Sequence, residues 1–333
     1  MPVRILNQAE VTALLPMAEC VEVMDQALRT LSAGDALLPL RTVLRLPDGK
    51  GFFGVMPAHL GAPAALGLKA ISVFPGNEGT ELDSHQGLVI LFEPERGMPV
   101  AVMDASSITA VRTAAVSAVA TRVLAREDAG DLAILGSGVQ ARTHLEAMAT
   151  VRRIRRVRSW SPHRERVAGF VRWAGDRFGA RVEPTTNPRD AVLGADLVCT
   201  VTASRTPVVE GAWVAEGAHI NAVGSSLPTT RELDTGAVVR GRLVVDRRES
   251  ALNEAGDFLI PRAEGAITDG HIVGELGEVL LGRAAGRTAA REITIFKSLG
   301  LAVEDVAAAH HVLARAEARG VGVVADLGGR RSA

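Results

Sequence analysis

Residues 131–141 read DLAILGSGVQA, and this stretch decides the fold. The apolar run DLAIL is typical of a short buried strand, and helix-forming sequence follows as far as about Val151. Between strand and helix lies the pattern G-x-G-x-x-G/A. In this pattern Gly136 permits a tight turn, Gly138 lets the backbone approach a pyrophosphate, and Ala141 lets the helix pack closely on the strand. Because a helix N-terminus also attracts phosphates, we predict a dinucleotide site here.

The sequence around this turn predicts the rest of the fold. Further predicted strands at 156–160, 195–202, 218–224 and 243–246 are separated by helical stretches or turns. Strands joined by helical crossovers form parallel sheets. We therefore predict an α/β fold with a doubly wound parallel sheet of the Rossmann type.

The flanking sequence has a different texture. After a helix at 16–33, short apolar or alternating segments separated by turn residues predict a largely antiparallel sheet as far as residue 104. A helix at 105–124 is rich in small residues, and a final amphipathic helix runs from about 303 to 319. We expect this last helix to fold back on the first part of the chain.

Composition excludes several classes of protein. The 333 residues are 47% hydrophobic and 23% charged, so the chain can bury a core without disulfides or a structural metal. A net charge of −1 argues against nucleic-acid binding. Cys20 and Cys199 suggest neither a disulfide framework nor a zinc site. The chain has no apolar run of membrane-spanning length and no signal-peptide core near its start, so we expect a reduced, cytoplasmic protein.

Two residue types narrow the chemistry. The sequence has no tyrosine, which excludes a mechanism that uses a tyrosine as acid. Lysine occurs only at Lys50, Lys69 and Lys297, whereas arginine supplies the other cations. Lysine can release a proton near neutral pH and arginine cannot, so these lysines are candidate proton donors.

The end of the second predicted strand indicates which cofactor is preferred. An NAD enzyme usually carries Asp or Glu there for the ribose hydroxyls, but the first acid here is Glu165. Ser161 can hydrogen-bond a 2′-phosphate, and His163 or Arg164 can neutralise it. We predict a preference for NADP(H), with NAD(H) possible; the alternative is a solvated basic turn.

Candidate substrate groups lie in the first part of the chain, and each has an alternative structural role. Lys69 lies in the apolar run GLKAISVF, where it needs a partner or a cavity, unless its side chain extends to water. Arg112 lies among small residues and must find an anion, either a ligand or an acid such as Asp104. The other candidates are Arg41, Asp83 and His85, the last of which could be a packed polar residue beside Ser84.

Several runs resemble the ornithine cyclodeaminase/mu-crystallin family. They are SHQGLVILFEPERGMPVAVMD, ITAVRTAAVSAVAT, ILGSGVQA, HINAVGSSLPTTRELD, ALNEAGD and FKSLGLAVED, in family order from about Pro39 to Ala309. The resemblance implies an enzyme that binds NAD(P)(H) and acts at the C–N bond of amino or imino acids. Members include cyclodeaminases, ketimine reductases and alanine dehydrogenases.

The resemblance also implies an organisation and a site. A homodimeric, substrate-binding α+β domain of residues 1–125 and 303–333 would enclose a Rossmann domain of residues 126–302. Arg41, Lys69 and Arg112 match residues around the substrate carboxylate. The implied cofactor contacts are Ser84, His85, Arg112, Ser137, Val139, Gln140, Ser161, His163, Thr202, Val223 and Ser298. Glu254 matches a residue of the ligand pocket.

One departure from the family pattern favours a reductase. Cyclodeaminases carry an aspartate at the position of Ser226, and a serine hydroxyl cannot hold a charge near pH 7. Ketimine reductases of the mu-crystallin type have serine there. We therefore predict NAD(P)H-dependent reduction of a cyclic imino acid with Lys69, Ser226 and Glu254 as catalytic residues.

Other activities remain open at this point. Ornithine cyclodeaminase or alanine dehydrogenase activity would need another acid, such as Asp83 or Glu254. A different class of function is a non-catalytic protein that binds a small ligand and retains NADP.

Overall fold

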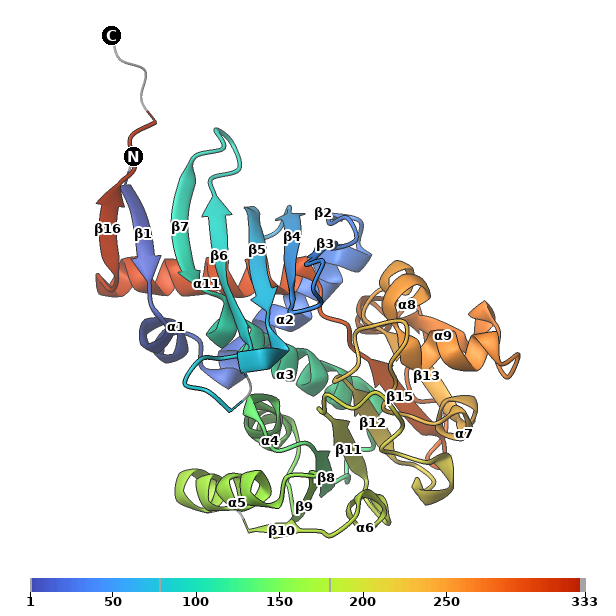
Figure 1. The fold of residues 1–333 in the computed structure, drawn as a ribbon. Coiled ribbons are helices and arrows are strands. Elements are labelled where there is room, and N and C mark those ends of the chain that lie inside the picture. Colours follow the sequence, from blue (N-terminus) through green and yellow to red (C-terminus); the bar gives the residue numbers. More distant parts are fainter. Residues whose placement is uncertain (1, 78, 180, 330–333) are drawn as a thin grey trace. The chain divides into compact units, whose positions relative to one another are not determined.

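The computed structural model describes residues 2–77, 79–179 and 181–329. The chain divides into two compact units, each built on one sheet (Figure 1). Unit 1 comprises Met1–Arg112 and Leu301–Ala333, and unit 2 comprises Thr113–Gly300.

Unit 1 contains an eight-stranded sheet with the order β16-β1-β7-β6-β5-β4-β2, and β3 pairs with β4. Its strands are β1 (Pro2–Leu6), β2 (Ala36–Leu37), β3 (Thr42–Arg45), β4 (Phe52–Leu60), β5 (Ala65–Val73), β6 (His85–Phe92), β7 (Pro99–Asp104) and β16 (Val323–Asp326). Its helices are α1 (Gln8–Leu14), α2 (Met17–Ser32), the short η1 (Pro75–Asn77) and α11 (Ala302–Arg319). The sheet is antiparallel except where β1 pairs with β7, so the predicted antiparallel sheet is confirmed.

One face of this sheet is covered by helices of the same unit. Helix α11 packs on β4, β5 and β6 and against α2, so the last helix does fold back on the first part of the chain. Under it lie the cross-strand neighbours Met56, Lys69, Val89 and Met103, all buried. Because side chains alternate along a strand, the residues between them point to the opposite face.

Unit 2 contains a second eight-stranded sheet, entirely parallel, with the order β10-β9-β8-β11-β12-β15-β13-β14. Its strands are β8 (Asp131–Leu135), β9 (Arg156–Trp160), β10 (Val182–Pro184), β11 (Leu197–Thr200), β12 (His219–Ala222), β13 (Gly241–Val245), β14 (Ile272–Glu275) and β15 (Ile293–Lys297). Every residue of β11 and β12 is buried, as expected for central strands covered on both faces. The predicted doubly wound parallel sheet is confirmed.

The helices of unit 2 follow its strands. They are α4 (Val139–Val151), α5 (Arg164–Phe178), α6 (Pro188–Val192), α7 (Thr235–Arg240), α8 (Arg248–Glu254), α9 (Gly256–Ala263) and α10 (Leu276–Leu280), with short turns η2 (Gly211–Trp213) and η3 (Asp269–His271). Phe258 of α9 belongs to the buried apolar cluster with Ile220, Leu243 and Ile295 of the sheet.

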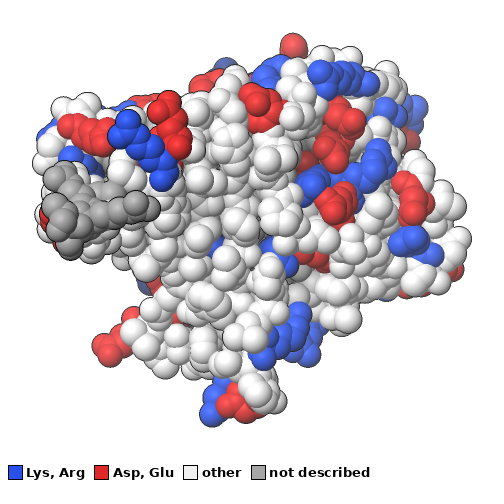
Figure 2. Space-filling view, turned by 90° about the horizontal axis from the view of Figure 1, so that it is seen from above, with Lys and Arg blue, Asp and Glu red and all other residues white. Residues whose placement is uncertain are grey.

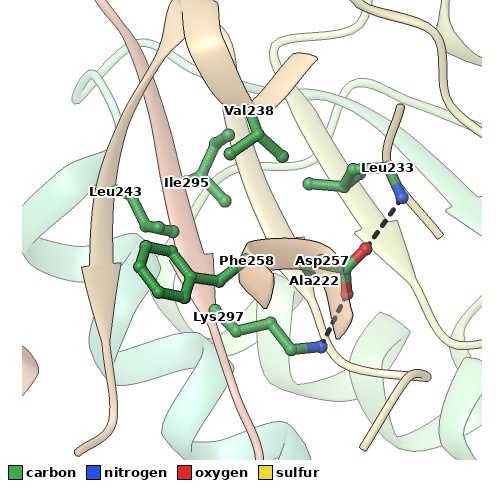
Figure 3. A pocket seen from close by; sticks show the side chains of 8 residues that line it. All are labelled: Ala222, Leu233, Val238, Leu243, Asp257, Phe258, Ile295 and Lys297. Carbon is green, nitrogen blue, oxygen red and sulfur yellow. Dashed lines mark hydrogen bonds and ion pairs between the residues drawn. The ribbon is translucent and has the colours of Figure 1, made fainter. Parts of the chain in front are cut away.

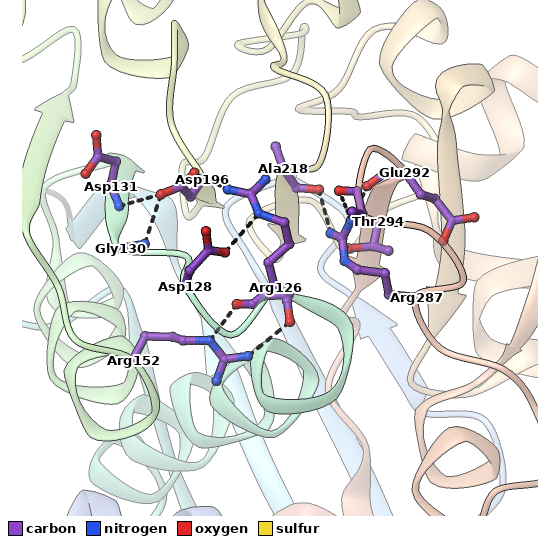
Figure 4. A network of polar contacts seen from close by, with 12 residues as sticks. Arg126, Asp128, Gly130, Asp131, Arg152, Asp196, Ala218, Arg287, Glu292 and Thr294 are labelled. Atoms are coloured by element: carbon purple, nitrogen blue, oxygen red, sulfur yellow. Dashed lines mark hydrogen bonds and ion pairs between the residues drawn. The ribbon is translucent and has the colours of Figure 1, made fainter.

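Helix α3 (Ala105–Leu124) contains the boundary between the units, at Arg112 and Thr113. Its C-terminal half belongs to unit 2 because cations of unit 2 bind its end (Figure 4). The Arg152 guanidinium donates to the carbonyls of Thr121 and Arg126, and that of Arg287 donates to the carbonyl of Leu124. The Arg287 donor satisfies a carbonyl of the last turn of α3, where partners within the helix run out, and the Arg152 donors add further hydrogen bonds at this end.

Two general surface properties bear on the class of protein. On the face shown in Figure 2, Lys and Arg side chains lie beside Asp and Glu side chains in mixed clusters. Among residues 2–77, 79–179 and 181–329, no helix is long and apolar enough to cross a membrane.

Candidate active site

Lys69 is buried on the covered face of the sheet in unit 1. Its side chain is 2% exposed, and its cross-strand neighbours are Met56 and Val89. The alternative that it extends to water is therefore wrong. A buried ammonium needs a partner of opposite charge, and α11 supplies one.

Four charged side chains meet at this point. Lys69 Nζ lies 2.7 Å from Asp305 Oδ2, and Arg112 Nε lies 2.8 Å from Asp305 Oδ1. Arg112 Nη1 also lies 2.7 Å from Glu304 Oε2. All four side chains are at most 4% exposed. Asp305, in the first turn of α11, thus contacts both Lys69 and Arg112.

These contacts agree with one of the two alternatives that the sequence left open for Arg112. It pairs with acids of its own chain, Glu304 and Asp305, whereas Asp104 accepts a hydrogen bond from the amide of Ser107. The signal that could have identified the partners is the pair of adjacent acids in the run FKSLGLAVED. Acids in the first turn of a helix are common for electrostatic reasons alone, so the pattern did not single them out.

Burial gives Lys69 an unusual acidity. Desolvation lowers its pKa to about 8, the charge on Asp305 opposes this effect, and the charges on Arg112 and Arg41 add to it. Burial opposes ionisation of Asp305 too, but the charges and hydrogen bonds of Arg112 and Lys69 outweigh it and lower the pKa of that carboxyl. The cluster therefore holds an ionised aspartate beside a lysine that can exchange a proton near neutral pH.

Other candidates of unit 1 lie around this cluster. Arg41, directly before β3, is near enough for its charge to affect Lys69. His85 begins β6, its Nδ1 lies 3.0 Å from Ser84 Oγ, and partial burial and the charge on Lys69 lower the pKa of His85. Asp83 is exposed. Arg41 and His85 thus join Lys69 and Arg112 in one part of unit 1.

In unit 2, the predicted cofactor residues all follow the carboxyl ends of neighbouring strands. The turn 136–138 follows β8, Ser161 follows β9, Thr202 follows β11, Val223 follows β12 and Ser298 follows β15. In a parallel sheet these ends form one edge. The strand order reverses between β8 and β11, and such an edge position is where doubly wound sheets bind ligands.

The turn at β8 has the geometry that a pyrophosphate requires. Gly136 has φ +126°, and a Cβ there would lie 2.6 Å from the carbonyl oxygen of Val201. A Cβ at Gly138 would meet no atom within 4 Å, so the backbone is open to approach at this point. Gly138 is also the N-cap of α4 and no side chain caps this helix. The residues present therefore fit a dinucleotide phosphate.

Two buried polar atoms add to this fit. The Oε1 atom of Gln140 and the Oγ atom of Ser298 have no hydrogen-bond partner among the described residues. Buried polar groups normally have one, so these atoms are suited to a polar ligand. Both residues are predicted cofactor contacts.

The remaining predicted residues are placed as follows. Ser161 is buried, its Oγ accepts a hydrogen bond from the amide of His163, and Arg164 begins α5 with an exposed side chain. Ser226 is exposed in the loop after β12, and the half-buried Glu254 ends α8. Within residues 2–77, 79–179 and 181–329, no group of three His, Cys, Asp or Glu side chains could hold a metal ion.

Sequence reasoning missed a buried polar network in unit 2. Glu232, Asp257 and Lys297 are all at most 4% exposed and are connected through hydrogen bonds and one ion pair. Glu232 and Asp257 lie in the runs HINAVGSSLPTTRELD and ALNEAGD, which carried the family resemblance, but their spacing gives no sign that they meet. Lys297, ranked by composition as a proton donor, is part of this network, whereas Lys50 is exposed and pairs with Asp48.

The two units together define the class of protein. Unit 2 is a Rossmann-type sheet with a glycine turn that fits a phosphate, and unit 1 holds a buried lysine whose pKa is lowered. This combination is typical of a dinucleotide-dependent enzyme. The chain belongs to the ornithine cyclodeaminase/mu-crystallin family, whose sequence pattern matches residues 2–320.

Known relatives agree with this assignment. The chain is 43% identical to ketimine reductase mu-crystallin of Mus musculus over 83% of this chain and 84% of that protein. Among solved structures, Thermococcus litoralis Delta(1)-pyrroline-2-carboxylate reductase in complex with NADH and L-proline has a TM-score of 0.94 at 39% identity, covering 96% and 99% of the two chains. An archaeal alanine dehydrogenase dimer with bound NAD has a TM-score of 0.93 at 35% identity, covering 98% and 100%.

These similarities confirm the predicted family and fold. They also confirm the predicted class of activity, an oxidoreductase that acts on carbon–nitrogen bonds of amino or imino acids. Both solved relatives hold a nicotinamide dinucleotide, which agrees with the predicted cofactor class.

Proposed function

We propose that this protein reduces a cyclic imino acid, such as 1-pyrroline-2-carboxylate or 1-piperideine-2-carboxylate, to the cyclic amino acid. The observation that carries the proposal is the burial of Lys69 beside Asp305, because burial lowers the pKa of Lys69 to about 8 while the ion pair holds the side chain in place. Two relatives named as ketimine and pyrroline-carboxylate reductases, one of them bound to NADH and L-proline, support the substrate class.

Lys69 is proposed as the proton donor. Its Nζ, largely protonated at pH 7, transfers a proton to the ring nitrogen of the imine and so makes the imine carbon more electrophilic. A bound reduced nicotinamide supplies the hydride to that carbon. One hydride and one proton convert C=N to CH–NH, and Lys69 regains its proton from solvent. Asp305 holds the ammonium in place through the cycle.

Arg41 and Arg112 are proposed to bind the substrate carboxylate. The positive charges of both arginines act on Lys69, beside the acids Glu304 and Asp305, and guanidinium groups at this point are suited to bind an anionic substrate. Arg112 already donates from Nε and Nη1 to these acids, so it shares its guanidinium between structure and substrate. Arg41 then has the larger role in orienting the carboxylate.

Ser226 and Glu254 are proposed to act at the reacting end of the substrate. The Ser226 hydroxyl would orient a water molecule or the ring nitrogen, and the Glu254 carboxylate would balance the positive charge of the protonated imine. Because serine cannot take up a proton charge, Ser226 suits a reductase better than a cyclodeaminase.

The cofactor residues are assigned by the edge of the parallel sheet. We assign the pyrophosphate to Gly136, Ser137, Gly138, Val139 and Gln140, and the nicotinamide to Thr202 and Val223. Ser84, His85, Arg112 and Ser298 are proposed as further contacts. NADP(H) is proposed as the preferred form because Ser161, His163 and Arg164 can bind a 2′-phosphate where no acid follows β9.

We further propose a homodimer that uses the uncovered face of the sheet in unit 1. The strand register aligns apolar side chains on this face across the sheet, and they are exposed in the single chain. They include Val323, Ile5, Leu88, Phe53 and Leu44, exposed by 66, 43, 48, 42 and 63%. Exposed apolar side chains gathered on one face of a sheet are typical of a subunit interface, and one solved relative is a dimer.

A paired assay tests the activity. One arm follows NADPH and NADH oxidation with five- and six-membered cyclic imino acids, and the other follows ammonia release from ornithine and from alanine with NAD. Turnover in the first arm alone supports the reductase. Ornithine or alanine turnover would instead make Asp83 and Glu254 the acids to mutate. Silence in both arms, with cofactor still bound, would favour a binding protein that retains NADP.

Both cysteines are free and buried, which fits the proposed cytoplasmic location.

A further inference from the structure

Glu232 is a buried acid to which the proposed reaction gives no role. Its side chain is fully buried and receives three hydrogen bonds. The backbone amide and the hydroxyl of Thr202 donate to Oε1 at 2.7 and 2.6 Å, and the amide of Gly224 donates to Oε2 at 2.7 Å. A buried carboxylate is retained at low cost only when donors of this kind surround it.

The three donors come from two different loops. Thr202 lies directly after β11, and Gly224 lies in the loop after β12 that also carries Val223 and Ser226. One carboxylate therefore fastens the two loops to which we assign the nicotinamide. The contact is tight: a Cβ at Gly224 would lie 2.2 Å from the carbonyl oxygen of Thr202 and 2.5 Å from Glu232 Oε1.

A second layer holds Glu232 itself in place. Asp257 Oδ1 accepts hydrogen bonds from the amides of Glu232 and Leu233 at 2.8 and 2.9 Å. Asp257 Oδ2 lies 2.9 Å from Lys297 Nζ, which also donates to the carbonyl of Ser225 (Figure 3). The chain on both sides of Ser226 is thus bound to a buried ion pair.

Glu232 can hold both loops because each of its two side-chain oxygens accepts hydrogen bonds; its size alone would not be sufficient. Both oxygens of Glu232 accept, and every partner in these bonds donates. A glutamine has nearly the same size, but its amide nitrogen would face an N–H group and could not accept from it. This substitution would therefore release one loop and leave the packing volume unchanged.

We propose that Glu232 is a positioning residue that fixes the loops after β11 and β12 for the nicotinamide end of the cofactor. The inference rests on the proposed function, because the nicotinamide is assigned to these loops by that proposal. Glu232 is buried behind the loops and acts through the backbone of Thr202 and Gly224.

The test compares two ligands on the Glu232→Gln variant by isothermal titration calorimetry. NADH carries the nicotinamide, and ADP-ribose is the same molecule without it. We expect NADH binding to weaken about tenfold, as for a buried hydrogen-bond donor left unpaired, and ADP-ribose binding to change less than about twofold. The fluorescence of bound NADH should also change. Equal loss for both ligands, or no loss for either, overturns the proposal.

Asp196→Asn is the matched control. Like Glu232, Asp196 accepts hydrogen bonds from backbone amides: its Oδ2 accepts from Gly130 and Asp131 at 3.0 and 3.1 Å (Figure 4). These contacts lie at the amino ends of β8 and β11, at the opposite edge of the sheet from the loops assigned to the nicotinamide. This variant should bind both ligands like the wild type. A selective loss of NADH affinity in the control as well would overturn the proposal, because the effect would then not depend on the nicotinamide loops.

Two outcomes separate this inference from the proposed function. Failure of the wild-type protein to bind either NADH or NADPH contradicts the proposed function itself. If Glu232→Gln does not fold, Glu232→Asp keeps the carboxyl group and withdraws it from the loops by one methylene group. A selective loss of NADH affinity in that variant supports the inference, and unchanged affinity for both ligands contradicts it.

Discussion

Lys69 on β5 and Asp305 on α11 form a buried ion pair of 2.7 Å that connects the two chain segments of which unit 1 is built. Asp305 also accepts a hydrogen bond from Arg112, so one carboxylate serves two cations. Removing one member of such a cluster leaves the others buried without compensation. Loss of either member would therefore destabilise unit 1, and the charge on Asp305 opposes the lowering of the Lys69 pKa by burial.

The Lys69→Arg variant distinguishes two properties of Lys69, its positive charge and its ability to donate a proton. Arginine keeps the positive charge beside Asp305 but cannot release a proton near neutral pH. We expect kcat for imine reduction to fall by about 100-fold or more, with the dissociation constant of NADPH unchanged within about twofold. Lys50→Arg, at an exposed lysine that pairs with Asp48, is the control and should leave both quantities unchanged. Full activity of Lys69→Arg would remove Lys69 from the role of proton donor.

The pH dependence of the reduction should report the same lysine. The donor must be protonated, and burial lowers its pKa to about 8, so the protonated fraction decreases as the pH rises through that value. We expect kcat to be constant below this pKa and to fall about tenfold per pH unit above it. Initial rates from pH 6 to 10 measure this profile. A profile that stays flat to pH 10 would contradict the assignment.

Ser161→Asp should change the cofactor preference. A carboxylate after β9 repels a 2′-phosphate and can accept hydrogen bonds from the ribose hydroxyls of NADH. We expect the ratio of kcat/KM for NADPH to that for NADH to fall by at least about tenfold. Arg164→Ala should lower the use of NADPH alone, and Arg166→Ala on the same helix serves as control. An unchanged ratio in Ser161→Asp would show that the 2′-phosphate lies elsewhere.

Leu88→Glu should dissociate the proposed homodimer. The substitution places a charge in the middle of the exposed apolar face, where a partner subunit would have to bury it. Light scattering after size exclusion should give the dimer mass for the wild type and the monomer mass for the variant. Val239→Glu, on α7 of unit 2 and equally exposed, should remain dimeric. A dimeric Leu88→Glu protein would place the interface on another surface.

Arg152→Ala should destabilise the protein through the end of α3. Its guanidinium donates to the carbonyls of Thr121, Ala125 and Arg126, and the variant would leave these acceptors without that donor. We expect a loss of about 2–4 kcal/mol in the free energy of unfolding, measured with urea. The neighbouring Arg153 is exposed, so Arg153→Ala should cost less than about 0.5 kcal/mol. Equal stability of the two variants would contradict this role of Arg152.

Local patterns predicted most of the fold. The strand, glycine turn and helix at residues 131–151 were predicted from the sequence, as were the parallel sheet and the antiparallel sheet of unit 1. Strands β1, β2, β10, β14, β15 and β16 were missed. Strand β15 lies between β12 and β13 although it comes last in its unit, because strand order depends on pairing between distant segments. No local periodicity carries that information.

The sequence by itself determined the phosphate-binding turn, the family and the residue types available for proton transfer. These follow from short-range requirements, such as the absence of a Cβ at Gly136 and the small number of lysines. Only the tertiary structure decided that Lys69 is buried and paired with Asp305, and that Glu232 connects the loops of Thr202 and Gly224. Burial and charge pairing arise when segments far apart in the chain meet, and the energy of a charge depends on the groups that surround it.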